Sequence, residues 1–185
     1  MNTTLNRLNA VSAMATSTLL VLLCLVALLT HPAARAPSGT LAVHTLAVDK
    51  ARAVWHADRR TQDFLQVHFD ADVDLRPLFG RNTKQVFVSL AVEYSSRRHP
   101  NNSIVLWDRI VRRKADAHVV LQDARNKYPV REVARSFENI ADATFVLKWN
   151  VMPYVGLLAY GDDASSGRIV LPRRSEVEKG AKVYY

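Results

Sequence analysis

The longest run of hydrophobic positions in this chain lies at residues 11–30, and the sequence has no Lys, Arg, Asp or Glu between Arg7 and Arg35. A helix of about 20 apolar residues rises ~30 Å, which is the thickness of the hydrocarbon core of a bilayer. A buried core helix is disfavoured because the run has no polar face that could meet water. The pattern therefore predicts a transmembrane helix, which we place at residues 11–31, after a short tail at residues 1–10.

A cleaved secretory signal is the main alternative, with Arg7 in its polar start and Ala34-Arg35-Ala36 as a small-residue cleavage site. Pro37 would directly follow that cut, and the apolar run exceeds the roughly 7 to 15 residues of an ordinary signal core. An uncleaved anchor is favoured. Because one Arg flanks the helix on each side, charge alone does not decide which way the helix is oriented in the membrane. The short leading tail favours a cytosolic N-terminus and a translocated remainder.

The remainder of the chain carries strand patterns. Residues 64–75 are the clearest, because apolar and polar side chains alternate there as in a half-buried antiparallel strand. Residues 85–94 are apolar on both faces for most of their length, which is typical of a central strand. Further strands are predicted at 40–48, 104–111, 117–121, 143–151 and 167–171, with a short segment between Gly156 and Gly161.

Turns and connections separate these strands at 51–63, 95–103, 122–130 and 133–140, the last being a helical turn or a long connection. Many short strands without a long helix after the anchor favour a sandwich or a barrel. The predicted fold class is mainly β: a single N-terminal transmembrane helix followed by an antiparallel β-sandwich luminal domain at residues 32–185.

The composition narrows the classes of partner. Net charge is +8, and the one cysteine, Cys24, lies inside the membrane run, so no intrachain disulfide can form. A translocated domain meets no nucleic acid, so the basic charge suits acidic protein surfaces or anionic lipid headgroups. The membrane itself is a predicted partner through one helix.

Four polar residues, His68, Asp70, Asp72 and Asp74, share the exposed face of the strand at 64–75. A row on one strand cannot wrap an ion, and no EF-hand loop or His-Glu-x-x-His motif accompanies it. The sequence also lacks a Gly-x-Ser-x-Gly elbow and a Ser-x-x-Lys motif. We therefore predict no catalytic residues, no metal site and no cofactor.

Two other groups of residues are candidate sites. Asn101-Asn102-Ser103 is an N-glycosylation acceptor if this loop reaches the lumen, which makes Asn101 the candidate site. Three aromatic residues in the predicted strands, Phe87, Trp107 and Trp149, are expected in the core or at an interface.

Several ordered blocks resemble the signal peptidase complex subunit 3 family, the glycosylated 22/23 kDa luminal subunit. They are Met1-Asn2-Thr3 with Leu5 and Arg7, Phe69-Asp70-Ala71-Asp72-Val73-Asp74-Leu75 with Leu78-Phe79, Lys84-Gln85-Val86-Phe87-Val88 through Glu93-Tyr94-Ser95, Ile104-Val105-Leu106-Trp107-Asp108-Arg109-Ile110-Val111, and Leu147-Lys148-Trp149-Asn150-Val151-Met152-Pro153. Two features depart from the family: Arg81-Asn82 stands where members often carry Trp-Asn, and the acceptor at Asn101 is differently placed.

The resemblance implies a single-pass type II protein of the endoplasmic reticulum membrane, with most of its chain in the lumen. It implies assembly with the catalytic signal peptidase subunit and the other subunits of a complex that removes signal peptides. In that family the catalytic serine lies in a different subunit. The alternatives are a membrane-anchored or secreted β-sandwich adhesion or binding domain, and a tethered hydrolase that uses His68 with Asp70 or with Asp72 on the same strand face.

Overall fold

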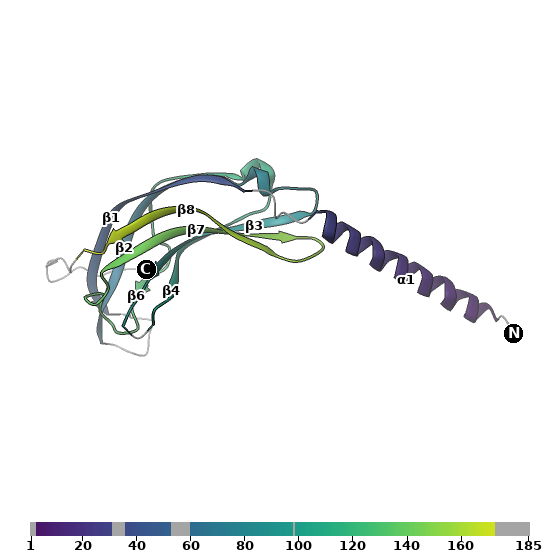
Figure 1. Ribbon diagram of the computed structural model, residues 1–185, viewed down its shortest axis with the longest axis horizontal. Coiled ribbons are helices and arrows are strands. Elements are labelled where there is room, and N and C mark those ends of the chain that lie inside the picture. Colours follow the sequence, from purple (N-terminus) through teal and green to yellow (C-terminus); the bar gives the residue numbers. More distant parts are fainter. Residues whose placement is uncertain (1–2, 31–35, 53–59, 98, 173–185) are drawn as a thin grey trace.

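The computed structural model describes residues 3–30, 36–52, 60–97 and 99–172 (Figure 1). Its N-terminal helix α1 spans Thr4–Leu29, and none of its residues is buried. Thr3 caps the helix by accepting a hydrogen bond from the Asn6 amide at 3.4 Å. α1 is the one helix of the described residues that is long and apolar enough to cross a membrane. The prediction of an apolar N-terminal helix is confirmed, although α1 begins at Thr4 rather than at residue 11.

Two antiparallel sheets form the remainder of the described chain. Sheet A has the order β1-β2-β5, with the short β6 pairing to β2, and sheet B has the order β4-β3-β7-β8. The strands of sheet A are β1 (Ser38–Arg52), β2 (Thr61–Asp74), β5 (His118–Arg125) and β6 (Val130–Arg131). Those of sheet B are β3 (Thr83–Tyr94), β4 (Asn102–Val111), β7 (Asp142–Pro153) and β8 (Ala159–Val170). Two single-turn 3-10 helices, η1 (Arg76–Leu78) and η2 (Lys114–Asp116), lie in the connections.

The core lies between the two sheets, and β2 and β3 supply its centre. The inward side chains of β2 are at most 2% exposed: Leu65, Val67, Phe69, Ala71 and Val73. Those of β3 are at most 1% exposed: Val86, Val88, Leu90 and Val92. Burial of such apolar surface is the main force that holds a domain without disulfides together. The predicted mainly β class, the alternating strand and the central position of β3 between β4 and β7 are confirmed.

Several predicted strand boundaries are wrong. The predicted connection at 51–63 is shorter than expected, because β1 continues to Arg52 and β2 begins at Thr61. β5 continues to Arg125, where the sequence suggested a loop from residue 122, because a bulge opposite Phe69 and Ala71 lets the strand resume its pairing. β8 is a single strand over Ala159–Val170, where Gly156, Gly161 and Gly167 suggested two separate segments. Gly161 is accommodated inside the strand because the Trp149 ring lies where a β-carbon would stand.

The two ends of the sandwich differ in their relation to α1. The β7–β8 hairpin and the β2–β3 connection lie beside the C-terminal end of the helix, and β6 lies far from it (Figure 1). Because β3 starts at the helix end, its other end and the β3–β4 loop that follows are distant from α1. Asn101 is exposed in that distant loop.

Candidate functional site

The outer face of sheet A carries a ladder of histidine–carboxylate pairs that crosses β1, β2 and β5. Each pair joins two neighbouring strands, and the nitrogen–oxygen distances are 2.6, 2.7 and 2.7 Å for His44 with Asp70, His68 with Asp123 and His118 with Asp72. The polar row predicted from the sequence is therefore present, but its histidine partners come from the adjacent strands. Neither Asp70 nor Asp72 pairs with His68.

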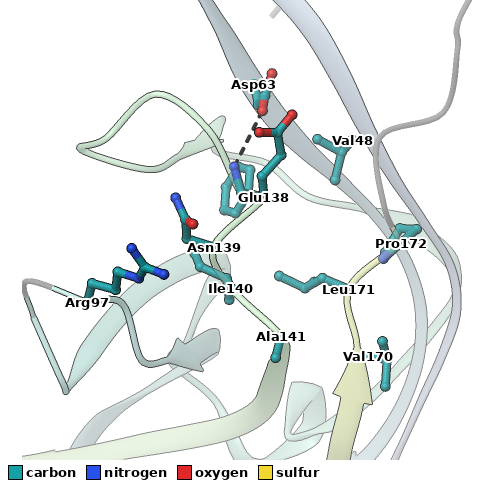
Figure 2. A pocket seen from close by; sticks show the side chains of 11 residues that line it. Val48, Asp63, Arg97, Glu138, Asn139, Ile140, Ala141, Val170, Leu171 and Pro172 are labelled. Atoms are coloured by element: carbon teal, nitrogen blue, oxygen red, sulfur yellow. Dashed lines mark hydrogen bonds between the residues drawn. The ribbon is translucent and has the colours of Figure 1, made fainter.

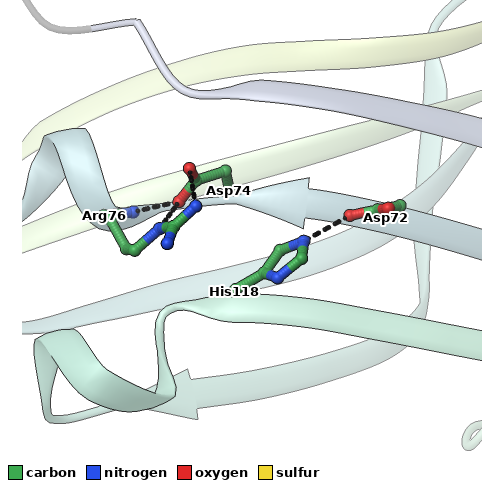
Figure 3. Close-up of polar contacts among 4 residues, drawn as sticks. All are labelled: Asp72, Asp74, Arg76 and His118. Atoms are coloured by element: carbon green, nitrogen blue, oxygen red, sulfur yellow. Dashed lines mark hydrogen bonds and ion pairs between the residues drawn. The ribbon is translucent and has the colours of Figure 1, made fainter.

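Local geometry stabilises the charged carboxylates of this face. The Asp123 backbone has a φ of 47°, a left-handed conformation that aspartate tolerates better than most residues, and its amide donates to Asp70 at 2.7 Å. This hydrogen bond, together with His44, lowers the pKa of Asp70. At the end of β2 the Arg76 side chain donates two bonds of 2.7 Å to Asp74, and its amide donates one of 2.9 Å (Figure 3). These bonds lower the pKa of Asp74 to about 2.

The ladder does not form a catalytic or metal-binding arrangement. Among the described residues, no serine, threonine or cysteine side chain hydrogen-bonds to His44, His68 or His118. No group of three or more His, Cys, Asp or Glu in that part of the chain could hold a metal ion. Since each histidine already has a carboxylate partner, the arrangement orients charges on the surface of a sheet.

A cavity of about 430 Å³ at the end of the sandwich away from α1 was not anticipated from the sequence (Figure 2). Asp63, which is 2% exposed, lies on its wall, and its Oδ2 accepts a long hydrogen bond of 3.4 Å from the Phe137 amide. Its Oδ1 has no hydrogen-bond partner in the described chain. Arg97 and Glu138 also line the cavity, but the described residues of its walls include no Ser, Thr, Cys or His, so they do not assemble a nucleophile with its base.

Trp107 and Trp149 both point into the sandwich. Trp107 packs edge-on against Phe69 of the opposite sheet, with ring centroids 6.3 Å apart and an interplanar angle of 71°. Trp149 packs against the core cluster and covers Gly161 on the neighbouring strand. Its indole Nε1 is buried and has no hydrogen-bond partner among the described residues. The structure thus places both tryptophans in the core layer.

Phe87 is different, because it lies on the outer face of sheet B. Its neighbours Val86 and Val88 are core residues, so strand alternation points the Phe87 side chain outward, where it pairs with Ile110 of β4 and Asn150 of β7. Other apolar residues share that face, and together we call them the apolar face of sheet B: Phe87, Val105, Ile110, Met152 and Tyr160.

This apolar face is open to solvent in the isolated chain. Val105, Ile110 and Tyr160 are 41, 47 and 69% exposed. The Lys148 ammonium and the Glu93 carboxylate form an ion pair toward one end of the face. Sequence reasoning named only Phe87, because residues 104–111 are apolar on both faces and do not reveal which side is covered. Exposed apolar patches of this kind mark interaction sites.

One membrane helix and a sandwich with a self-paired polar face and an uncovered apolar face define a membrane-anchored β-sandwich suited to protein contacts. Comparison with known proteins makes this class specific. Residues 1–174 match the family described as "Signal peptidase subunit". The chain belongs to the signal peptidase complex subunit 3 family.

Three relatives with that name illustrate the similarity. The Saccharomyces cerevisiae protein is 33% identical over 151 residues, which cover 81% of this chain and 82% of the relative. The Gallus gallus protein is 29% identical over 179 residues, covering 97% and 99%. The Homo sapiens protein is 31% identical over 121 residues, covering 65% and 67%. The resemblance found in the sequence blocks is confirmed, and the chain is a subunit of a signal peptidase complex with an N-terminal membrane helix.

Proposed function

We propose that this chain is a non-catalytic subunit that supports and positions the catalytic serine peptidase subunit of the signal peptidase complex. In this role it serves the removal of signal peptides from proteins translocated into the endoplasmic reticulum. The observation that carries the proposal is the apolar face of sheet B, which is uncovered in a chain that belongs to this family. A half-exposed apolar sheet face gains free energy when a partner domain covers it.

The proposal includes a type II topology in the endoplasmic reticulum membrane. Residues 1–10 are the cytosolic tail, residues 11–31 the span and residues 32–185 the luminal domain. The exposure of Asn101 in a loop distant from the helix supports luminal placement, because an acceptor must be accessible to the glycosylating enzyme. A glycosidase that removes N-linked glycans should increase the gel mobility of the chain. Asn101→Gln should abolish that shift, and an unchanged shift in this variant would refute Asn101 as the site.

The role of the chain in processing is tested by replacing the endogenous subunit of a cell with this chain. Depletion without replacement should leave secretory precursors uncleaved, and the introduced chain should restore cleavage and co-purify with the catalytic subunit. Normal processing in depleted cells would contradict the proposal. Restored cleavage without co-purification of the catalytic subunit would contradict the positioning role.

The non-catalytic role has its own test. Each histidine of the ladder on sheet A is replaced by alanine, and precursor cleavage is measured in the depleted cells. Cleavage should remain at the unsubstituted level because the ladder contains no assembled nucleophile in the described chain. Abolished cleavage by His68→Ala, with normal assembly of the complex, would instead assign this chain a chemical role.

A further inference from the structure

The end of the sandwich next to α1 combines exposed apolar side chains with unpaired cations. We propose that this end binds the surface of the bilayer that α1 spans, with the tip of the β7–β8 hairpin at the boundary of headgroups and acyl chains. In the same arrangement, lipid phosphates bind between Arg81 and Lys114. The proposal rests on the membrane helix and is independent of the catalytic partner.

Direct contacts fix the height of the hairpin relative to the helix. The Asn82 side chain donates to the Thr30 hydroxyl at 2.7 Å and to the Val155 carbonyl at 2.6 Å, and it accepts from the Val155 amide at 3.0 Å. A β-carbon on Gly156 would lie only 3.0 Å from the Ala27 β-carbon, so the hairpin backbone packs against the last turn of α1. Ala27 precedes Thr30 by about 4.5 Å of helical rise, so the hairpin reaches back along the apolar helix.

The side chains at this tip suit the interfacial region of a membrane. Tyr154, Leu157 and Leu158 are 68, 80 and 48% exposed. Exposing these apolar side chains to water is unfavourable for a domain in solution. At a membrane surface the same residues are favoured, because tyrosine holds its ring among the headgroups while leucine enters the acyl boundary. Because the tip lies beside the end of the membrane helix, we infer that lipid contacts these side chains.

A basic cavity of about 610 Å³ lies beside the helix end and is lined by Leu29, Arg81, Lys114 and the Thr30 cap. Arg76 also lines it, but this side chain is already paired with Asp74. Among the described residues, neither Arg81 nor Lys114 forms an ion pair, and no acidic residue lines the cavity. A cavity with unpaired cations, adjacent to the end of a membrane helix, attracts the phosphates of lipid headgroups.

The single native cysteine makes the test direct. A Cys24→Ser chain has no thiol, so Leu157→Cys in that background accepts one environment-sensitive fluorophore at the hairpin tip. The matched control is Val133→Cys, a residue that is 83% exposed next to β6, far from the helix. Full-length chains are placed in lipid nanodiscs and exposed either to brominated acyl chains or to aqueous iodide.

The label at residue 157 should emit at shorter wavelength than the label at residue 133, be quenched by brominated lipid and resist iodide. The label at residue 133 should respond only to iodide. Equal quenching of both labels by iodide would overturn the proposal. Repeating the measurement in the assembled complex separates lipid from protein: a tip shielded from both quenchers there would show that another subunit covers it, which also overturns the proposal.

The cation site has a charge-matched control. Arg81→Ser with Lys114→Ser removes the two unpaired cations, and Lys50→Ser with Arg97→Ser removes one lysine and one arginine at the opposite end. Raising the fraction of anionic lipid should increase brominated-lipid quenching of the tip in the parent and in the control pair. The response should be lost in the Arg81 and Lys114 variant, and an unchanged response there would refute phosphate binding between these residues.

Discussion

The two outer faces of the sandwich differ in whether their side chains find partners within the chain. On sheet A each carboxylate of the ladder is paired with a histidine, and Asp74 is paired with Arg76, all from the same chain. On sheet B, the apolar side chains around Phe87 and Ile110 remain open to solvent. The contrast indicates that sheet A is complete as it stands, whereas sheet B presents a surface that a partner can cover.

The largest expected effect separates these two faces directly. Ile110→Asp adds a charge to the apolar face of sheet B, where Ile110 is 47% exposed, and Val120→Asp adds one to the outer face of sheet A, where Val120 is 50% exposed. If a partner covers sheet B, the first variant must bury an unpaired charge in the interface. Recovery of the catalytic subunit by affinity purification should fall about tenfold or more, which is the range of interface hot spots.

Val120→Asp should leave that recovery unchanged, because its face is expected to stay in water. Circular dichroism of both variants checks that each sandwich is folded. Equal recoveries with the two variants would remove the functional distinction between the faces.

A second prediction concerns the support of sheet B from inside. Gly161→Ala places a methyl group where the Trp149 ring lies, so the ring or the β8 backbone must move. Overpacking of this kind costs about 1–3 kcal/mol of unfolding free energy. Chemical denaturation measures the loss. The cost should shrink when Trp149→Leu is combined with Gly161→Ala, and an unchanged cost in the double variant would show that the ring is not responsible.

A smaller effect is expected at Asp163, next to β1 at the edge of sheet B. Its Oδ2 has no hydrogen-bond partner among the described residues, and burial raises its pKa. The Asp163 carboxyl group therefore stays protonated to a higher pH in the folded state than in the unfolded state. As a result, the free energy of unfolding decreases as pH rises through the folded pKa. Asp163→Asn should increase the free energy of unfolding by about 1 kcal/mol at pH 7.

The same substitution should give no gain at about pH 3, where Asp163 is protonated in both states. Asp162→Asn is the control, because this neighbour is exposed. Thermal unfolding across that pH range provides the measurement, and a gain that is equal at both pH values would contradict the proposed cause.

The smallest effect is expected on the self-paired face. Arg76→Gln removes the side-chain bonds that lower the pKa of Asp74 to about 2, and the pKa should rise toward its ordinary value of ~4 in an NMR titration. The stabilisation from this pair is fully present above pH ~4 and is lost as pH falls toward 2. The free energies of unfolding of the parent chain and of Arg76→Gln should therefore differ most at neutral pH. Arg113→Gln, which removes the partner of Asp116, should leave the pKa of Asp74 unchanged.

The pattern of apolar and polar residues predicted the parts of the fold that depend on local sequence. The alternation at residues 64–75 identified β2 by its period of two, and the uninterrupted apolar run before Thr30 identified α1 by its length. The continuity of β8 was missed, since two glycines that signal turns in isolation are accommodated here by the Trp149 ring and by an open edge. Such compensation comes from a neighbouring strand and leaves no local signal.

The candidate surfaces were predicted only in part for a similar reason. The polar row on β2 was visible, but the histidines that pair with Asp70 and Asp72 lie on β1 and β5, and the bulges that align them depend on strand register. The role of Asn82 was also hidden. It joins the helix cap, the β2–β3 connection and the β7–β8 hairpin, which are far apart in sequence.

That joint has a mechanical consequence. Asn82 and Gly156 both contact the last turn of α1. Because of these two contacts, we expect the sandwich and the helix to rotate together as one rigid body. A bilayer of different thickness tilts a spanning helix. With this joint, we expect a tilt of the helix to turn the sandwich with it, so that sheet B would face a different direction in a membrane of different thickness.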